Sequence, residues 1–235
     1  MGLILCIETG TDVCSVGLAE DGQLTALRES DGRDHARNVA VYVDEMLRER
    51  NLSTRELDAV AVGKGPGSYT GLRIGVSFAK GLCYGLGIPL IAVGSLDSLV
   101  EVAIEDNEAG IVDIDSIETA TLCPMIDARR MEVYTQLFDG RGVAKSEVEA
   151  KVIDAESFRD EIAAASEFVI FGNGAAKCVG TMPPSVKLID VKPSARGMAR
   201  LAQRALDEGR TEDVAYFEPF YLKDFVITVS KKKIF

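Results

Sequence analysis

The feature that most constrains this chain is a repeat in the order of its predicted elements. In both halves, alternating apolar residues and glycine turns predict three strands, followed by a helix, a strand, a helix, a strand and a helix. The predicted strands of the first half are 3–8, 13–19, 23–29, 58–63 and 88–93, and its helices are 35–50, 71–86 and one from Ser95. The second half has strands at 119–126, 131–138, 143–152, 168–171 and 186–191, and helices at 154–165, after 174 and at 194–206. We therefore predict two lobes of one βββαβαβα topology.

Short sequence echoes support a duplication. VAVGKG in the first half corresponds to FVIFGNG in the second, and IPLIAVGS corresponds to VKLIDVKPS. The acidic, weakly periodic stretch 105–118 is the natural boundary. We predict an N-terminal lobe over residues 1–108, and a C-terminal lobe over 109–235 that ends in the basic tail SKKKIF.

Composition limits the function classes. The chain has 37 acidic and 26 basic side chains, a net charge of -11, which disfavours nucleic-acid binding by this chain alone. No apolar run approaches the roughly 20 residues of a membrane span, and we expect a cytoplasmic protein without a membrane partner. Three of the cysteines lie in apolar runs typical of buried thiols, and no two form a C-x-x-C pair. The cysteines are Cys6, Cys14, Cys83, Cys123 and Cys178.

Duplicated lobes of this order are the plan of the actin-like ATPase and sugar-kinase superfamily, which is built from RNase-H-like lobes. The first lobe opens with Glu8-Thr9-Gly10-Thr11, an acid and a glycine turn between two predicted strands, as in that superfamily. This is a fold-level analogy, and it leaves the chemistry open.

The glycine-rich stretch GKGPGSYTG, residues 63–71, resembles a phosphate loop but has the wrong spacing. A P-loop needs a lysine after its last glycine, whereas Lys64 precedes the loop here. A G-x-G-x-x-G reading places Ser68 or Thr70 where the third glycine belongs. We interpret the stretch as a joint that delivers the chain to a helix capped by Ser68 or Thr70, at whose N-terminus an anion could still bind.

The helix predicted after this loop is apolar over most of its circumference. Gly71, Gly75 and Ala79 form a ridge of small residues that lets another backbone approach closely. Two readings stay open: burial of this helix within the chain under the first helix, or a subunit interface built from both helices. The residues expected at the interface are Val39, Tyr42, Val43, Met46, Gly71, Ile74, Gly75, Phe78, Ala79 and Leu82.

Five segments together resemble the TsaB family, older name YeaZ, over nearly the whole chain. These segments are ILCIETGTDVCSVGL, VGKGPGSYTGLRIGVSFAKGL, IPLIAVGSLDSL, DARRMEVY and EPFYLKD. The resemblance implies a partner of the TsaD-like subunit that transfers threonylcarbamoyl to adenosine 37 of tRNAs reading codons that begin with A. It also implies a TsaE-like ATPase in the same complex, a homodimer when the chain is alone, and tRNA contact only through the complex.

The sequence offers little chemistry of its own. Where the catalytic relative has a metal-binding H-x-x-x-H pair, this chain has Ser95 and Leu99. The only histidine, His35, is expected to be a solvated residue at a helix start. The turn that begins at Asp127 lacks glycines. Gly172-Asn173-Gly174 is expected to be a plain turn, although it could also line an adenosine. We expect no catalytic, cofactor-binding or metal residue in this chain, with ATP or ADP only at the interface of a complex; the alternatives are an active actin-like ATPase or small-molecule kinase, or a metallopeptidase.

Overall fold

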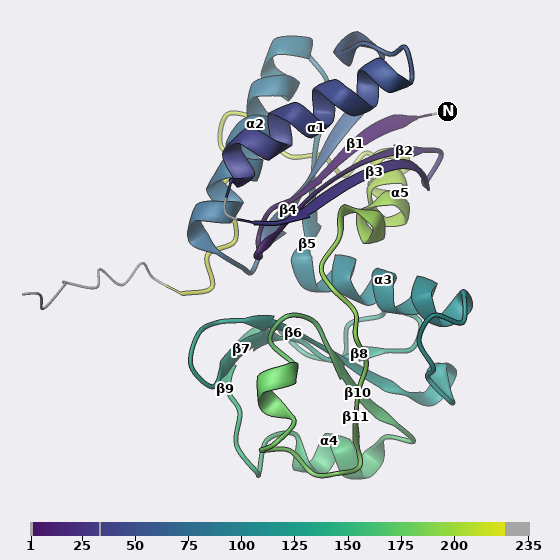
Figure 1. Cartoon of the computed structure of the whole chain (residues 1–235), viewed down its shortest axis with the longest axis vertical. Helices are drawn as coiled ribbons and strands as arrows, with labels where there is room; N and C mark the ends of the chain where they lie inside the picture. The colour runs from purple at the N-terminus through teal and green to yellow at the C-terminus, as the bar shows by residue number, and fades with distance from the viewer. Residues whose placement is uncertain (1, 33, 224–235) are drawn as a thin grey trace, which may run out of the picture.

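The structure is a computed structural model that describes residues 2–32 and 34–223. Two lobes, each with its own sheet, are stacked along the long axis of the molecule (Figure 1). The predicted basic tail, residues 230–235, lies outside the described residues. The strands of the first lobe are β1 (Leu3–Glu8), β2 (Val13–Glu20), β3 (Gln23–Asp31), β4 (Ala59–Gly65) and β5 (Leu90–Gly94).

The two sheets have one topology. In the first sheet the order is β3-β2-β1-β4-β5; β1, β2 and β3 are antiparallel, and β4 and β5 run parallel to β1. In the second sheet the order β9-β7-β6-β10-β11 repeats this pattern of directions. Its strands are β6 (Thr121–Asp127), β7 (Glu132–Thr135), β9 (Glu149–Val152), β10 (Phe168–Phe171) and β11 (Val186–Leu188). The prediction of two tandem RNase-H-like lobes is confirmed.

The second lobe has shorter strands than the sequence predicts. The segment predicted as 131–138 breaks into β7 and a short strand β8 (Phe138–Asp139), and only the end of 143–152 is extended. Side chains explain the difference: the Asp139 carboxylate accepts the N–H groups of Arg141 and Val143, both at 2.9 Å. Side chains that bind nearby backbone groups compete with the ladder of a sheet.

Two helices cover one face of the first sheet. They are α1 (His35–Glu49) and α2 (Tyr69–Leu86), which lie side by side in Figure 1. Their inward side chains join alternate residues of β1, β2 and β4 in one apolar core. The opposite face of the sheet is covered by α5 (Ala199–Asp207), through residues such as Ala199, Ala202 and Ala205.

The last helix of each half packs on the sheet of the other half. Helix α3 (Ser95–Glu108) ends the first half of the chain, but its apolar side chains pack on β6 and β10 of the second sheet. Helix α5 comes near the end of the second half and covers the first sheet. The other face of the second sheet is covered by α4 (Arg159–Ala164) and the segment 175–182. The packing therefore crosses the 105–118 stretch at which the sequence divides.

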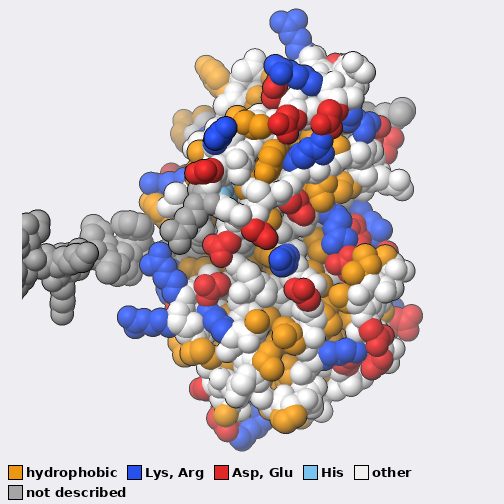
Figure 2. Space-filling model, in the orientation of Figure 1, with side chains coloured by type: hydrophobic (Ala, Val, Ile, Leu, Met, Phe, Trp, Pro, Cys, Tyr) orange, Lys and Arg blue, Asp and Glu red, His pale blue; other side chains and the backbone are white. Residues whose placement is uncertain are grey.

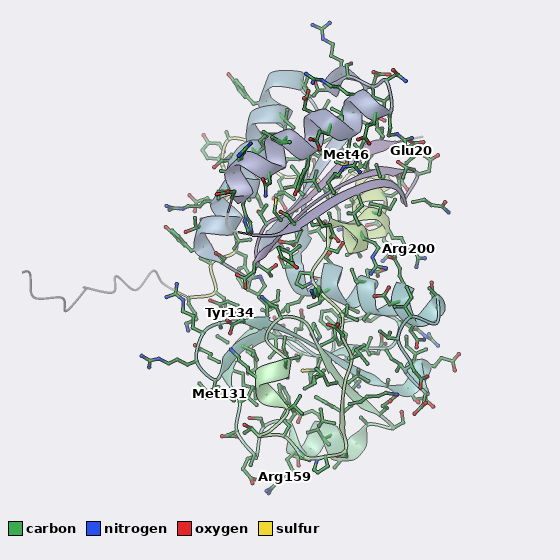
Figure 3. The ribbon with its side chains drawn as sticks, in the orientation of Figure 1. Glu20, Met46, Met131, Tyr134, Arg159 and Arg200 are labelled. Carbon is green, nitrogen blue, oxygen red and sulfur yellow. The ribbon has the colours of Figure 1, made fainter. Side chains whose placement is uncertain are left out.

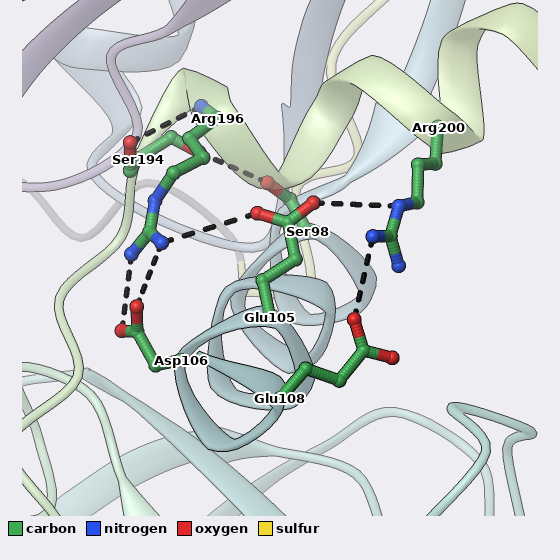
Figure 4. A network of polar contacts seen from close by, with 7 residues as sticks. All are labelled: Ser98, Glu105, Asp106, Glu108, Ser194, Arg196 and Arg200. Carbon is green, nitrogen blue, oxygen red and sulfur yellow. Dashed lines mark hydrogen bonds and ion pairs between the residues drawn. The ribbon is translucent and has the colours of Figure 1, made fainter. Parts of the chain in front are cut away.

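A polar clamp joins α3 to the 3-10 turn Ala195–Met198 that leads into α5 (Figure 4). The guanidinium of Arg196 donates two hydrogen bonds to the carboxylate of Asp106, at 2.7 and 3.0 Å, and Asp106 is buried. The Ser98 hydroxyl donates to the carbonyl of Ser194 at 3.2 Å. A Cβ at Gly197 would overlap the carbonyl of Ser98, so the two elements cross at backbone contact.

Candidate functional site

The glycine-rich stretch is a joint between α2 and the turn after β1. Ser68 is the N-cap of α2, and its hydroxyl accepts the N–H of Gly71 at 3.3 Å. The N–H of Ser68 donates to the carbonyl of Gly10 at 2.6 Å, so a group that could hold a phosphate is already bonded. A Cβ at Gly67 would overlap Gly10, and one at Gly71 would overlap the carbonyl of Thr9. These contacts confirm the interpretation as a joint.

The ridge of small residues faces the chain's own sheet, which corrects the reading of the ridge as an outer surface. Gly71, Gly75 and Ala79 are buried. A Cβ at Gly75 would overlap the Thr9 hydroxyl and lie 3.5 Å from a methyl group of Val62 on β4. The ridge lets α2 lie close to the sheet, because backbones can approach only where side chains are small.

Four of the ten residues predicted at an interface reach the surface of the chain. Tyr42 on α1 and Ile74, Phe78 and Leu82 on α2 are partly exposed, and the three α2 residues border α1. Two adjoining hollows of about 590 and 400 Å³ meet at Phe78 and are open to solvent. The other six lie beneath this face and support it: Val39, Val43, Met46, Gly71, Gly75 and Ala79. Figure 3 shows Met46 under α1.

A second small-residue stripe lies on the outer side of α2, and the sequence analysis missed it. Ser77, Gly81 and Gly85 are exposed at i, i+4, i+8 spacing, and among the described residues a Cβ at Gly81 or Gly85 would meet no atom outside the helix's own backbone within 4 Å. The fold of this chain therefore does not require glycine at either position. The side chain of Tyr84 beside them is 87% exposed. The sequence shows the spacing of these three residues, but it does not show that this side of α2 faces solvent.

The end of the described chain forms a strap, residues 212–223, along the first lobe. The strap begins at β5, where the N–H of Glu212 donates to the carbonyl of Leu90 at 2.8 Å. It then passes α2, where the ammonium of Lys80 donates to the carbonyl of Phe217 at 2.8 Å. The strap thereby borders the outer face of α2.

At the start of α2, aromatic and cationic side chains hold the strap. The Tyr221 ring packs on Tyr69, with 4.6 Å between the ring centroids, and its hydroxyl accepts from Arg73 at 3.3 Å. The Arg73 guanidinium lies 4.1 Å from the centroid of the Tyr69 ring, a cation–π distance. The last described residue, Lys223, forms an ion pair with Glu132 on the second lobe.

Glu8, the acidic residue at the end of β1, points into the interior of the protein. Glu8 is 1% exposed, and its carboxylate accepts the N–H of Gly10 at 2.7 Å and the hydroxyl of Ser95 at 2.9 Å. Burial raises the pKa of Glu8, and the two hydrogen bonds oppose the rise. A Cβ at Gly63 would overlap the carboxylate. Leu99, one turn after Ser95, packs in the apolar core of the second lobe.

The second turn is closed by its own side chains. Asp127 forms an ion pair with Lys177, and its N–H donates to the side-chain oxygen of Asn173 at 3.1 Å. A Cβ at Gly174 would lie 2.9 Å from the backbone at the end of β6. The Gly172–Gly174 segment is therefore a plain turn packed on β6, as predicted.

The prediction of a solvated His35 is wrong. His35 begins α1 as expected, but it is 7% exposed, and its Nε2 lies 2.9 Å from the carbonyl oxygen of Thr11. The helix start packs against the β1–β2 turn, a contact that no local sequence pattern shows. In the part of the chain that the structure describes, no group of three or more His, Cys, Asp and Glu side chains is placed to hold a metal ion.

The five cysteines are all buried and unpaired, which confirms the prediction for Cys6, Cys83 and Cys123. Burial raises the pKa of Cys6 to about 12 and that of Cys83 to about 11. At neutral pH these thiols are protonated and poor nucleophiles. Across residues 2–32 and 34–223, no helix is long and apolar enough to cross a membrane.

Comparison with known proteins decides the family. Over 232 residues, 95% of each chain, the chain is 32% identical to the tRNA threonylcarbamoyladenosine biosynthesis protein TsaB of Escherichia coli strain K12. The chain belongs to the TsaB family. Family membership links it to the biosynthesis of threonylcarbamoyladenosine in tRNA. A Haemophilus influenzae TsaB is 35% identical over 131 residues, 56% of this chain and 51% of that protein.

The TsaB fold is also found among solved structures. YeaZ from Pseudomonas aeruginosa superposes with a TM-score of 0.76 and 26% identity, covering 94% of this chain and all of that one. A second P. aeruginosa structure, described as an uncharacterised protein with similarity to peptidase YeaZ, has a TM-score of 0.78 at 26% identity, covering 95% of this chain and 100% of that one. Residues 29–231 match the family model described as TsaD, tRNA N6-adenosine threonylcarbamoyltransferase. TsaB-type and TsaD-type chains thus share one family model.

Proposed function

We propose that this chain is the non-catalytic partner subunit of a TsaD-type threonylcarbamoyltransferase, and that it docks through the outer face of α1 and α2. The observation that carries the proposal is this face: the partly exposed Ile74, Phe78 and Leu82 lie beside the glycines of the outer stripe. Glycine in a helix interior costs about 1 kcal/mol relative to alanine. Close approach of a partner helix over Gly81 and Gly85 would explain why glycine stands at these positions despite this cost.

The shared family model supports the choice of partner. A TsaD-type chain of the same family offers equivalent helices, and two equivalent faces pair around a twofold or pseudo-twofold axis. The same geometry serves a homodimer when the partner is absent. In this proposal a TsaE-like ATPase completes the complex, and any ATP or ADP binds at an interface rather than within this chain.

The chemistry of the turns supports a non-catalytic role. The Glu8 carboxylate is held by Gly10 and Ser95, and Asp127 is paired with Lys177. The N–H of Ser68 at the start of α2 is bonded to Gly10. The groups that hold metal and phosphate in actin-like ATPases are thus bonded inside this chain. The reacting groups come from the TsaD-type subunit.

Two Gly→Leu variants on the same helix test the proposal. Gly81→Leu on the outer stripe keeps or raises the melting temperature, because leucine favours a helix, and prevents co-purification with the TsaD-type subunit. Gly75→Leu on the inner ridge lowers the melting temperature, and the protein that remains folded still associates. Threonylcarbamoyladenosine in tRNA is measured for each reconstituted complex.

An exposed apolar residue elsewhere gives the control. Ile111, after the end of α3, is 69% exposed, and Ile111→Asp leaves association unchanged. If Gly81→Leu associates like the wild type, the outer face of α2 is not the interface. If the wild-type chain shows no association with the TsaD-type subunit, or modifies tRNA without it, the partner role is wrong.

A further inference from the structure

The turn between β6 and β7 holds two consecutive arginines in the left-handed backbone region. The φ angles are 72° at Arg129 and 49° at Arg130. Glycine or asparagine adopts this conformation at lower cost than arginine. Three hydrogen bonds, each of 3.1 Å, hold the turn. The N–H of Arg129 donates to Asp127 Oδ1. The N–H of Ala128 donates to the carbonyl of Glu132, and the N–H of Glu132 donates to the carbonyl of Arg129. A backbone this costly for arginine points to a use of the two side chains.

The charges around the turn leave both arginines unneutralised. The two acids that flank the arginines in sequence are both paired, Asp127 with Lys177 and Glu132 with Lys223. Arg129 and Arg130 are exposed, and neither forms an ion pair with any other residue between 2 and 223 that the structure describes. These four cations and two anions give a local net charge of +2 on a chain whose net charge is -11.

An aromatic side chain lies beside these cations. Tyr134 on β7 is partly exposed. Burial raises the pKa of its hydroxyl, and the positive charges of Lys223 and Arg129 oppose this rise. Figure 3 places Tyr134 near the end of the strap and Met131 farther down the same side of the second lobe, and Figure 2 shows Lys and Arg side chains projecting from this side. We call Arg129, Arg130, Tyr134 and Lys223 the β6–β7 patch.

The strap connects the patch to the proposed docking face. Tyr221 packs on Tyr69 at the start of α2, and two residues later Lys223, which belongs to the patch, pairs with Glu132 on β7. A subunit docked on α1 and α2 therefore lies next to the patch. RNA bound to that subunit would reach the patch without crossing the acidic remainder of this chain.

We propose that the β6–β7 patch contacts the tRNA within the complex, with Arg129 and Arg130 on phosphates and Tyr134 against a base or ribose. The inference rests on the proposed function, because it places the RNA on the docked TsaD-type subunit. A guanidinium group can donate two parallel hydrogen bonds to the oxygens of one phosphate, and aromatic rings stack on unpaired bases. The chain alone binds tRNA weakly, because the local charge of the patch is small beside the net charge of -11, which repels the RNA.

The test measures tRNA affinity of the complex with the TsaD-type subunit as a function of salt. In the variant Arg129→Gln with Arg130→Gln, the slope of log affinity against log salt falls by about one per arginine, and affinity at about 0.1 M salt falls by about tenfold per arginine. The control is Arg141→Gln with Lys145→Gln, which removes the same charge from another exposed turn. The control complex keeps the wild-type slope.

A third variant separates an RNA contact from a structural role. Arg130→Gly relieves the left-handed backbone, so it raises the melting temperature while it weakens tRNA binding. A fall in melting temperature would instead show that the arginine supports the fold.

Association with the protein partners is measured on the same samples. The inference is overturned if the complex stays intact and its tRNA affinity is unchanged by the double arginine variant, or falls equally in the control variant. Either result leaves the proposed partner role unaffected. Loss of the TsaD-type or TsaE-type protein with tRNA affinity unchanged would make the patch a protein-docking surface. Failure of the wild-type chain to associate with the TsaD-type subunit would overturn both proposals.

Discussion

At the scale of single residues, Glu8 shows how an acid of the actin-like plan is used here. In this chain the hydrogen-bond donors to the carboxylate are the N–H of Gly10 and the hydroxyl of Ser95, and it forms no ion pair with a Lys or Arg among the described residues. A buried carboxylate without a cationic partner is costly when ionised. Its bond to Gly10 closes the turn after β1, and its bond to Ser95 joins the end of β1 to the start of α3. We therefore assign Glu8 a structural role between the lobes.

Glu8→Gln tests this role through its pH dependence. Burial raises the pKa of Glu8 above its ordinary value of 4.5, so the stability linked to its proton is complete below about that pH and is lost as pH rises through the raised pKa. Glutamine cannot ionise, and its amide can donate to Ser95. We expect the melting temperature of the variant to exceed that of the wild type at about pH 8, with the difference shrinking toward pH 4.5. A difference independent of pH would contradict this account.

At the scale of elements, α2 carries small residues on two opposite sides, and the two stripes have different causes. Gly71 and Gly75 are required by the chain's own sheet, because a side chain at either would overlap residues after β1. Gly81 and Gly85 are not required by any described neighbour. A helix with both stripes can lie close to a sheet on one side and to a partner helix on the other.

The clamp between α3 and the turn before α5 gives a second prediction at this scale. Asp106→Ala removes the carboxylate that pairs with Arg196, whose side chain is only 30% exposed. We expect a loss of about 2 kcal/mol in the free energy of unfolding, below the range for fully buried pairs because Glu105 remains 3.9 Å from Arg196. Urea unfolding measures the loss.

The matched control is Glu108→Ala, which removes a 58% exposed partner of Arg200. An exposed pair of this kind contributes less than about 1 kcal/mol. Equal effects of the two variants would show that the clamp does not hold the lobes together.

At the scale of the whole molecule, the exchange of α3 and α5 makes the lobes depend on each other. Without the second half, the face of the first sheet that contains Ile4, Cys6 and Ile91 loses its cover, and the apolar side of α3 is exposed. Neither half on its own buries both faces of its sheet. The repeat in the sequence is thus two lobes in topology but one unit in packing.

We expect a single cooperative unfolding transition. Calorimetry should give an enthalpy of roughly 0.7 kcal/mol per residue that equals the van't Hoff enthalpy. A fragment of residues 1–108 should show no cooperative transition by itself and should regain one when mixed with residues 109–235. Two separate transitions in the full chain would show that each lobe is stable without the exchanged helix.

Local patterns in the sequence determined the elements of the first lobe closely. The strand predicted at 3–8 is β1, the helix predicted at 35–50 is α1 (His35–Glu49), and the helix predicted at 71–86 begins two residues earlier at Tyr69. Periodicity and capping are short-range properties, so neighbouring residues are enough to show them. In the second lobe, side chains such as that of Asp139 compete for the same backbone groups, and prediction was poorer.

The sequence by itself thus determined the duplicated topology, the joint at the glycine loop and the family, because these depend on residue types at fixed spacings. Only the tertiary structure decided that the Gly75 ridge faces inward, that His35 is buried, and that α3 and α5 are exchanged between the sheets. A helix that is apolar on most sides fits several partners equally well by pattern. The partner it takes is set by which distant surface is complementary in shape, and that information is present only when the chain is folded.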